Sequence, residues 1–448
     1  MLGSKRITGR PAVRRMVLAG LSLLLVVAAA PAARAATLLS QTTWGGPDSE
    51  VTEGTAVTAD GSTYLAGFTR SFDPAARPSI FVVKFAADGS LTWQRTWKGP
   101  EAFGDDEANG VAVAADGSVY VTGFTVGVTG DAVLLKFAPD GTLLWQRRWG
   151  GSGSDQAEAV AVGADGAAYV AGGTSSFGGG GVFVVKFTPA GALVWQRHWG
   201  TGSEDGQGVA VGPDGNLVVA GVAARPNVAG ASDLVLLKVD PAGALVWQRA
   251  YAGATNADAR GGVAVGADGS IYAAGALQEV TAAGRAVVNA LIVKFASAGG
   301  LTWGRGWGGR SGDVAGDVAV APAGTVLLAG DTNSFGAGSD DAFVLRLSPD
   351  GRGLDAVTWG GTGIDHGHGV GAGSTGTISL GATAQSPPYS FLGAPTRTTR
   401  PKATVSTPTA ALVDATGTVA DPAGTVATPT GGMSFAGGFD AALVRMAP

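Results

Sequence analysis

One motif recurs along the whole chain and limits what the chain can fold into. It reads Leu-x-Trp-Gln-Arg-x-Trp-Gly-Gly, returns about every 52 residues and contains all 11 tryptophans. The second aromatic residue of each copy gives seven positions: Trp44, Trp97, Trp149, Trp199, Tyr251, Trp307 and Trp359. Units of this kind are expected to bury their apolar faces against one another. A motif present in every unit serves the scaffold and does not mark a unique catalytic site.

The first 35 residues have the layout of a secretory signal peptide. Basic residues come first, an apolar run of 15 residues follows from 16 to 30, and Ala33-Arg34-Ala35 supplies a small-x-small cleavage site. That run is shorter than the roughly 20 residues that span a bilayer, so no membrane-spanning helix is expected. Arg14-Arg15 permits a twin-arginine signal, but general secretion is favoured. We expect the mature chain to begin at Ala36 and to be secreted, outside the cell or at its surface, with the periplasm as the alternative.

Composition narrows the classes of partner. The chain has no cysteine, so disulfides are excluded and stability must come from burial. Removing the leader takes six basic and no acidic residues, which leaves 24 Lys and Arg against 35 Asp and Glu and a formal charge of −11. This balance argues against a nucleic-acid partner. We expect a monomer whose partner is a protein or a polysaccharide.

Each unit is expected to form four short strands, which we name A to D. In the third unit they cover residues 160–162, 169–172, 183–187 and 194–199. Asp-Gly pairs stand between A and B and between C and D, as hairpin turns require. Strand A alternates Val with Ala or Gly, which suits a crowded position near an axis. Strand D carries the tryptophans and is expected to lie outermost and pack against a neighbouring unit.

The two ends of the mature chain indicate a closed ring. It opens with a lone strand D (38–44) and finishes with a lone strand C (440–446). We predict that residues 39–44 pair antiparallel with residues 441–446, so that both ends build the last unit. The predicted fold is therefore all-β, a seven-bladed β-propeller of four-stranded antiparallel blades over residues 36–448.

The Trp-Gly-Gly, Asp-Gly, Tyr-Val-Ala-Gly and Val-Val-Lys-Phe elements resemble the repeats of the bacterial SBBP-type β-propeller proteins. The resemblance covers nearly the whole mature chain. It implies an exported protein, associated with the envelope or extracellular, and it implies no particular reaction. The seventh unit departs most from the pattern.

An acidic residue recurs near the start of strand A in every unit. The D–A and B–C loops share one rim of a propeller, which we call the top rim and expect to carry binding. The acidic positions are Glu50, Asp105, Asp155, Asp205, Asp258, Asp313 and Asp365. They predict either a ring that binds a cation or a cationic partner, or carboxylates that cap backbone N–H groups where the chain enters strand A. Their repetition favours capping.

His366 and His368 break the repeat and are the best candidate for a unique site. Together with Asp365 they suggest a metal site or acid–base chemistry, although solvated or packed histidines fit the same pattern. Residues 105–116 have acidic spacing like that of a calcium loop, but residues 111–115 must be extended as strand A. We therefore expect no metal and no cofactor.

Two further features stand out. Strand C carries a cation at one place in every unit, which predicts ion pairs with turn aspartates such as Asp60 and Asp116. The cations are Lys84, Lys136, Lys186, Lys238, Lys294, Arg346 and Arg445. Residues 386–432 form a Pro- and Thr-rich insertion between strands B and C of the last blade, which we expect to lie as a flap over the top rim. Within it, residues 410–413 and 416–419 are candidates for a hairpin, and a degenerate extra blade is the other alternative.

These observations predict an exported, non-catalytic binding or scaffolding module that contacts its ligand through the top rim. A passive envelope or matrix component is a further possibility. An enzyme is the alternative, a lyase, hydrolase or quinoprotein-like oxidoreductase that uses the Asp365, His366 and His368 region. A deep axial pocket on which the histidines converge would favour the enzyme, and a flat open rim would favour binding.

Overall fold

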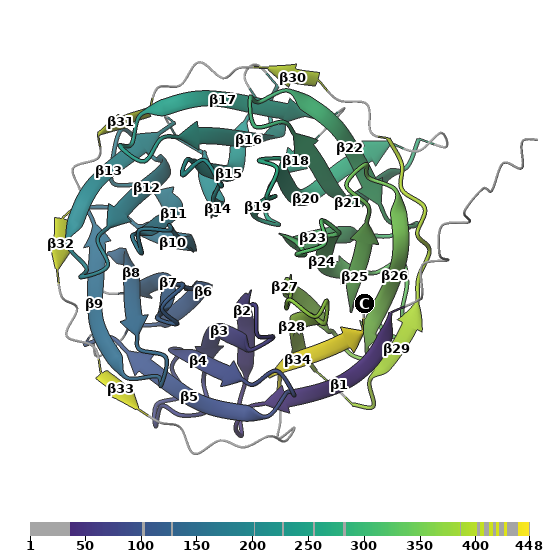
Figure 1. Cartoon of the computed structure of the whole chain (residues 1–448), viewed down its shortest axis with the longest axis horizontal. Helices are drawn as coiled ribbons and strands as arrows, with labels where there is room; N and C mark the ends of the chain where they lie inside the picture. The colour runs from purple at the N-terminus through teal and green to yellow at the C-terminus, as the bar shows by residue number, and fades with distance from the viewer. Residues whose placement is uncertain are drawn as a thin grey trace, which may run out of the picture. The chain divides into compact units, whose positions relative to one another are not determined.

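Seven small antiparallel sheets are arranged in a ring around a central axis (Figure 1). The computed structural model describes residues 36–447, apart from residues 101–103, 127–128, 201, 226–227, 254–255, 281–283, 386, 401–403, 407–411, 415–417, 421–424 and 428–437. The predicted signal peptide lies outside these residues. Every regular element in them is a strand, and no helix in this part of the chain has the length and apolar character to cross a membrane. The predicted seven-bladed propeller is confirmed.

Blades 1 to 7 follow the order of the chain, and their strands A to D run from the axis to the periphery. Blades 1 and 2 comprise β2 (Glu50–Val57), β3 (Thr63–Thr69), β4 (Ser79–Phe85), β5 (Leu91–Lys98), β6 (Asp106–Val113), β7 (Val119–Val126), β8 (Gly130–Phe137) and β9 (Leu143–Gly150). Blades 3 and 4 comprise β10 (Asp155–Val162), β11 (Ala168–Thr174), β12 (Gly181–Phe187), β13 (Leu193–Trp199), β14 (Asp205–Val211), β15 (Leu217–Ala224), β16 (Ser232–Val239) and β17 (Leu245–Ala252). Blades 5 and 6 comprise β18 (Ala257–Asp258), β19 (Val263–Val265), β20 (Ile271–Val280), β21 (Ala286–Phe295), β22 (Leu301–Trp307), β23 (Asp313–Val320), β24 (Val326–Thr332), β25 (Asp341–Leu347) and β26 (Gly353–Gly360).

Blade 7 is built from both ends of the chain. Its strands are β27 (His366–Ala372), β28 (Ile378–Ala384), β34 (Asp440–Ala447) and β1 (Thr37–Trp44), in order from the axis outward. β1 pairs antiparallel with β34, and the register runs from Trp44 opposite Ala441 to Leu38 opposite Met446. This is the predicted closure, and it completes the hydrogen bonding of the last blade.

Tight turns and close inner packing explain the glycine content. In blade 3 the A–B turn places Gly166 at a φ of 73°, a conformation that L-residues with a side chain rarely adopt. Near the axis the strands A of neighbouring blades almost touch. A Cβ on Gly208 would come within 2.7 Å of the Cα of Gly262. The small residues predicted for strand A therefore lie where two backbones meet.

The repeated motif joins each blade to the next through its indoles. The second Trp is buried, and its Nε1 donates to the Gln of the following blade, as Trp97 does to Gln146 at 2.7 Å. The first Trp donates to a carbonyl in the next C–D turn, as Trp93 does to Pro139 at 2.9 Å. The second-Trp contact to Gln recurs at Trp44, Trp149, Trp199 and Trp359. Each sheet is thus tied to its neighbour by apolar burial and by directional bonds.

Two departures from the motif compensate each other. Blade 4 has Tyr251 in place of the second Trp, and blade 5 has Gly304 in place of the Gln that would face it. A Cβ on Gly304 would lie 2.8 Å from the hydroxyl of Tyr251. The longer tyrosine therefore occupies the space that the missing glutamine leaves.

The cations of strand C lie near the bottom ends of the blades. Ion pairs with turn aspartates are present for Lys238 with Asp214 at 2.7 Å and for Lys186 with Asp165 at 3.5 Å. Asp60 and Asp116, the two aspartates named above, accept the N–H groups of Ser62 and Ser118 in their own turns, both at 2.9 Å. Four of these lysines also lie over tyrosine rings of their own blades, with Nζ 4.9 to 5.3 Å from the ring centre. These contacts give the cations a structural role.

The insertion of blade 7 encircles the ring. It contributes five short strands, each antiparallel to a strand on the periphery, and Figure 1 shows them on the outer side of the blades. We call these strands the belt: β29 (Ser390–Gly393) on β26, β30 (Thr404–Ser406) on β17, β31 (Leu412–Asp414) on β13, β32 (Thr418–Ala420) on β9 and β33 (Thr425–Ala427) on β5. A single bridge from Thr399 to Gly306 marks its passage along blade 5. The belt therefore visits blades 6 to 1 in reverse order.

The flap expected over the top rim is wrong for the described strands of the insertion. Their backbones pair with the open edges of the strands D, which satisfies peptide groups that would otherwise face water. The expected hairpin is also wrong, because β31 and β32 pair with different blades and not with each other. No degenerate blade forms from these strands.

Candidate functional site

The innermost strand of each blade is interrupted near its top end. In six blades one residue has no partner on strand B, so the ladder skips it as a β-bulge. The bulged residues are Glu53, Asn109, Glu158, Gln207, Gly316 and His368. In blade 5 the gap is wider, and Arg260 lies between β18 and β19. The seven blades thus place seven positions around one circle, and these positions carry different chemistry.

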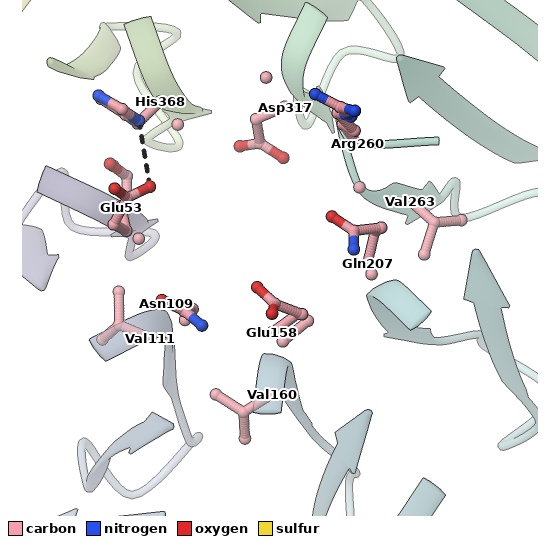
Figure 2. A pocket seen from close by; sticks show the side chains of 18 of the residues that line it. Glu53, Asn109, Val111, Glu158, Val160, Gln207, Arg260, Val263, Asp317 and His368 are labelled. Atoms are coloured by element: carbon pink, nitrogen blue, oxygen red, sulfur yellow. Dashed lines mark ion pairs between the residues drawn. The ribbon is translucent and has the colours of Figure 1, made fainter. Parts of the chain in front are cut away.

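These positions surround a cavity on the axis with a volume of about 310 Å³. Figure 2 shows side chains from every part of the ring facing it, with Val111, Val160 and Val263 among them. A volume near 300 Å³ is at the lower end of the range for small-molecule sites. The polar groups come from separate rigid sheets, so their spacing is fixed by the fold.

Two amides of the circle are oriented by hydrogen bonds. Asn109 Nδ2 donates to the carbonyl of Ala157 at 3.0 Å, and Gln207 Nε2 donates to Asp205 Oδ2 at 2.8 Å. Each partner can only accept, so the assignment of nitrogen and oxygen follows from the chemistry. Within the described residues the two amide oxygens have no partner and remain available as acceptors.

Two carboxyl groups of the cavity have strongly raised pKa values. Burial raises the pKa of Glu158 to about 8, and the carboxylates of Asp205, Glu53 and Glu107 act in the same direction. Burial also raises the pKa of Asp317 to about 7, against the N–H groups of Val370 and Val318 that donate to it. Carboxylates gathered in a partly dehydrated channel resist ionisation, as this site shows.

His366 and His368 both come from β27, the innermost strand of blade 7, but they have separate partners. His366 Nδ1 is 3.1 Å from Asp331 Oδ2, and that hydrogen bond raises the pKa of His366. His368 Nδ1 is 3.4 Å from Glu53 Oε2, and its Nε2 is 3.0 Å from the hydroxyl of Thr383. The two ring centres are 6.0 Å apart. Only His368 lines the cavity.

Asp365 does not join these histidines. It is fully buried and accepts hydrogen bonds from the N–H groups of Gly361 at 2.7 Å and Gln385 at 3.0 Å. The corresponding carboxylates of blades 1, 3 and 6 are equally buried and accept an N–H from the second residue after Trp. They are Glu50 with Gly46, Asp155 with Gly151 and Asp313 with Gly309. These contacts are the backbone capping that one of the two interpretations of the acidic ring expects.

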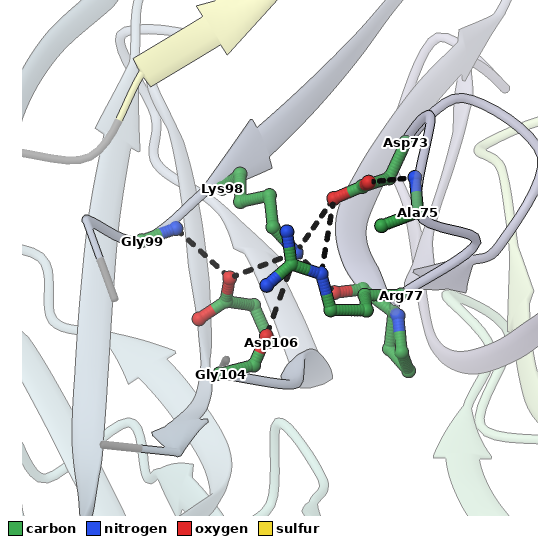
Figure 3. Close-up of polar contacts among 8 residues, drawn as sticks. Asp73, Ala75, Arg77, Lys98, Gly99, Gly104 and Asp106 are labelled. Atoms are coloured by element: carbon green, nitrogen blue, oxygen red, sulfur yellow. Dashed lines mark hydrogen bonds and ion pairs between the residues drawn. The ribbon is translucent and has the colours of Figure 1, made fainter. Parts of the chain in front are cut away.

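In blade 2 the capping residue is Asp106, and Asp105 stands one place before it. Asp106 Oδ2 accepts the N–H of Gly99 at 2.9 Å and lies 4.0 Å from Lys98 Nζ. Figure 3 shows this group, in which Lys98 also contacts Asp73 at 3.0 Å. Lys98 occupies the place where other units have the glycine after Trp. Blade 2 therefore has a capping carboxylate with an added counter-ion.

Asp205 and Asp258 also leave the capping ring. In blade 4 the capping carboxylate is Glu204, which accepts the N–H of Gly202 at 2.8 Å. Asp205 follows it and contacts Gln207, whereas Asp258 lies 3.4 Å from Arg260 Nε. Both are paired in register with the same place on strand B as His366 of blade 7, two residues above the level of the bulges. Of the nine residues singled out from the sequence, His368 alone lines the cavity, and Asp205, Asp258 and His366 lie on strands A two residues above the level of the bulges.

The circle of bulged residues was not predicted. A signal for it exists, because in six blades the bulged residue is the third after the capping carboxylate, as Glu53 is after Glu50. That position varies between units whose neighbouring residues repeat. Repetition drew attention to the carboxylates, although variation within a repeat is the better indicator of a ligand site.

Among the described residues no group of three or more His, Asp or Glu side chains is placed to hold a metal ion. The carboxylates are spread over separate blades, and each histidine is engaged by one carboxylate and lies away from the other pair. The cavity is therefore suited to a ligand that is larger than a bare ion and makes several separate hydrogen bonds.

Comparison with known families gives one match, to a β-propeller domain of unknown function (DUF5122), over residues 322–352. This stretch covers the A–B turn and strands β24 and β25 of blade 6. It supports a β-propeller repeat protein at the level of the fold. No curated protein matches the chain.

Solved structures include several distant likenesses. A protein of unknown function from Dyadobacter fermentans is 12% identical, with a TM-score of 0.44, over 93% of this chain and 99% of its own. Sqt1 from Chaetomium thermophilum is 12% identical, with a TM-score of 0.43, over 77% and 97%. The polysaccharide lyase Uly1 is 9% identical, with a TM-score of 0.41, over 82% and 90%. Likenesses at this level carry no argument about activity.

Proposed function

We propose that this protein is an exported, non-catalytic binding module that takes a small polar ligand, or a polar group of a larger partner, into the top of its central channel. The observation that carries the proposal is the circle of bulged residues, which differs from blade to blade while the surrounding motif repeats. Bulges at such places turn a side chain toward a site. Preformed polar groups on a rigid ring are typical of binding pockets. Export and an envelope protein or polysaccharide partner are part of this proposal, supported by the leader sequence and the charge.

A thermal-shift panel tests the binding function. The mature protein, from residue 36, is screened against amines, amino acids, neutral sugars and organic acids, and a ligand is expected to raise the melting temperature by mass action. The variant Gln207→Trp fills the cavity from its wall and is expected to lose the shift. Leu144→Trp places the same side chain at a position that is 52% exposed on a strand D and is expected to keep it. A panel in which no class of compound separates these variants would contradict the proposal.

Catalysis is the second candidate, and one observation favours it. His368 lines an axial cavity and lies beside Glu53, an arrangement open to proton transfer. Against it, Asp365 is committed to the backbone and His366 to Asp331. Loss of product formation in His368→Gln, with ligand binding retained, would establish the enzyme in place of the binding module.

A further inference from the structure

The circle of bulged residues offers many acceptors and few donors. Each amide donates one N–H, Asn109 to Ala157 and Gln207 to Asp205, and keeps its oxygen as an acceptor for a ligand. Glu158 has no hydrogen-bond partner among the described residues and adds a carboxylate from the blade between them. Blades 2, 3 and 4 therefore present three acceptors side by side. A ligand that satisfies them must carry several N–H or O–H donors.

Positive charge is scarce at this place. The wall contains one arginine and no lysine: Arg260, whose side chain is 73% exposed and whose Nε lies 3.4 Å from Asp258. The acidic groups Glu53, Glu158, Asp317 and Asp331 line the same cavity. Glu53 contacts His368 and Asp331 contacts His366, whereas no cationic side chain among the described residues pairs with Glu158. Burial of a carboxylate without a counter-ion is unfavourable, so a cation that enters the cavity beside Glu158 relieves an existing cost.

A bare metal ion does not meet these requirements. Direct ligation needs several ligand atoms within about 2.6 Å of one point, and the described residues hold no group of three or more His, Asp or Glu side chains placed for it. An ammonium or guanidinium group differs because it carries its own donors and a hydrocarbon body. Val111, Val160 and Val263 also line the cavity, as Figure 2 shows, and offer that body an apolar surface.

We propose that the channel binds the ammonium or guanidinium group of an organic cation, with Glu158 as its main counter-ion and the amide oxygens of Asn109 and Gln207 as hydrogen-bond acceptors. This proposal rests on the proposed binding function and names its ligand class. The cation is either a free amine or the basic side chain of a peptide, since both present the same chemistry.

The proposal has a pH signature. The charged groups that act on Glu158 are Asp205 of blade 4, Glu53 of blade 1 and Glu107 of blade 2, and all of them favour its protonated form. Its pKa of about 8 means that it carries little charge at pH 6. A bound cation favours the ionised form, so binding releases a proton and tightens as the pH rises. Alkyl amines keep their charge up to about pH 10, so the ligand does not produce this trend.

Titration calorimetry with two probes tests the proposal: 1,4-diaminobutane, and acetyl-lysine methylamide with a free side-chain ammonium. Affinity for at least one probe is expected to rise about tenfold or more from pH 6 to pH 8.5. Glu158→Gln keeps the shape and is expected to lose about tenfold in affinity at pH 8.5, and to keep only the smaller pH trend that Asp317, with its pKa of about 7, contributes. Arg260→Gln removes a like charge and is expected to strengthen binding about two- to threefold. Asp88→Asn, on an exposed C–D turn at the other rim, is the matched control and is expected to change nothing.

The direction of each change in affinity distinguishes the possible classes of ligand. Binding of the diamine alone assigns a free amine, and binding of the lysine derivative assigns a basic side chain. A ligand that binds more weakly to Arg260→Gln is an anion and overturns the proposal. If a neutral sugar stabilises the wild type but not Gln207→Trp, and neither amine binds, the binding function stands and the ligand class is wrong. If no compound binds, both proposals are wrong.

Discussion

The strand D of a typical blade repeats the same residues, whereas strand A changes at one place from blade to blade. On the periphery, Trp149 and four of its equivalents are buried and donate to a glutamine of the next blade. At the axis, the bulged position is Glu53 in one blade, Asn109 in the next and His368 in the last. The comparison shows that the residues that stabilise the fold and the residues that offer polar groups to a ligand lie on different strands of the blade. The outer contacts hold the sheets together, and the inner positions can differ because the repeated indole contacts between blades do not involve them.

The largest expected effect is on the periphery. Trp149→Ala removes an indole that is 2% exposed, packs on Phe183 with ring centres 4.3 Å apart and donates to Gln196 at 2.6 Å. We expect a loss of about 3–5 kcal/mol in the free energy of unfolding, from the cavity and the lost bond. Chemical denaturation measures it. Leu144→Ala, an exposed neighbour on the same strand, is the control and should cost well under half of this.

The second test concerns the compensating pair. Gly304→Gln introduces a side chain where Tyr251 already lies, and overpacking should cost about 1–3 kcal/mol. The double variant Tyr251→Trp/Gly304→Gln restores the motif of the other blades and should recover most of that loss. Denaturation of all four proteins in a double-mutant cycle measures the coupling. Additive effects would show that the two residues do not share one space.

The third test is at the axis and has the opposite sign. A raised pKa means that the folded state prefers protonated Glu158. The contribution of this group to the free energy of unfolding is therefore largest below the ordinary carboxyl pKa and falls as the pH rises toward about 8. Glu158→Gln removes this dependence and should add about 1–2 kcal/mol at pH 8.5 and close to nothing at pH 4. Melting curves across this range check it. A variant less stable than the wild type at pH 8.5 would mean that the carboxylate supports the fold.

The smallest expected effect on stability comes from the belt. Replacing residues 386–437 by a short Gly-Ser turn removes the fifth strands, whose hydrogen bonds are largely offset by the cost of ordering three-residue segments. We expect a loss of about 1–2 kcal/mol and a larger effect on association, since the edges of β5, β9, β13 and β17 become open. Light scattering against concentration checks this. A deletion variant that stays monomeric at high concentration would assign the belt another role.

The fold was predictable from sequence because its signals are local and repeated. Tryptophan spacing, Asp-Gly turns and the incomplete units at 38–44 and 440–446 were enough to place β1 beside β34. The path of the belt was not predictable, because pairing of Thr404–Ser406 with β17 depends on a free edge about 150 residues earlier in the chain. Short Thr-Val-Ala segments have no periodicity that indicates which partner they meet.

The site was predictable only in part, for a related reason. His368 stood out because it breaks the repeat, and it lines the cavity. Glu158 did not stand out, because a glutamate on a strand is unremarkable until three other carboxylates converge on it from separate blades. Asp155 is prominent in the sequence because its position repeats between units, but its buried carboxylate accepts a backbone N–H of its own loop. Convergence of residues from different blades follows from the ring, and no pattern within one unit contains it.

The belt also bears on the calibre of the central opening. It starts from blade 7, meets blade 6 first and blade 1 last, and so joins the two neighbours of the blade that the chain ends build. The ring is thus closed by the pairing of β1 with β34, and the belt adds strand pairing on the outer edges of blades 1 to 4 and 6. We expect this outer pairing to oppose outward movement of the sheets when a ligand enters the cavity. The width of the central cavity, and with it the size of the ligand that fits, is then expected to depend on contacts made at the outermost layer of the molecule.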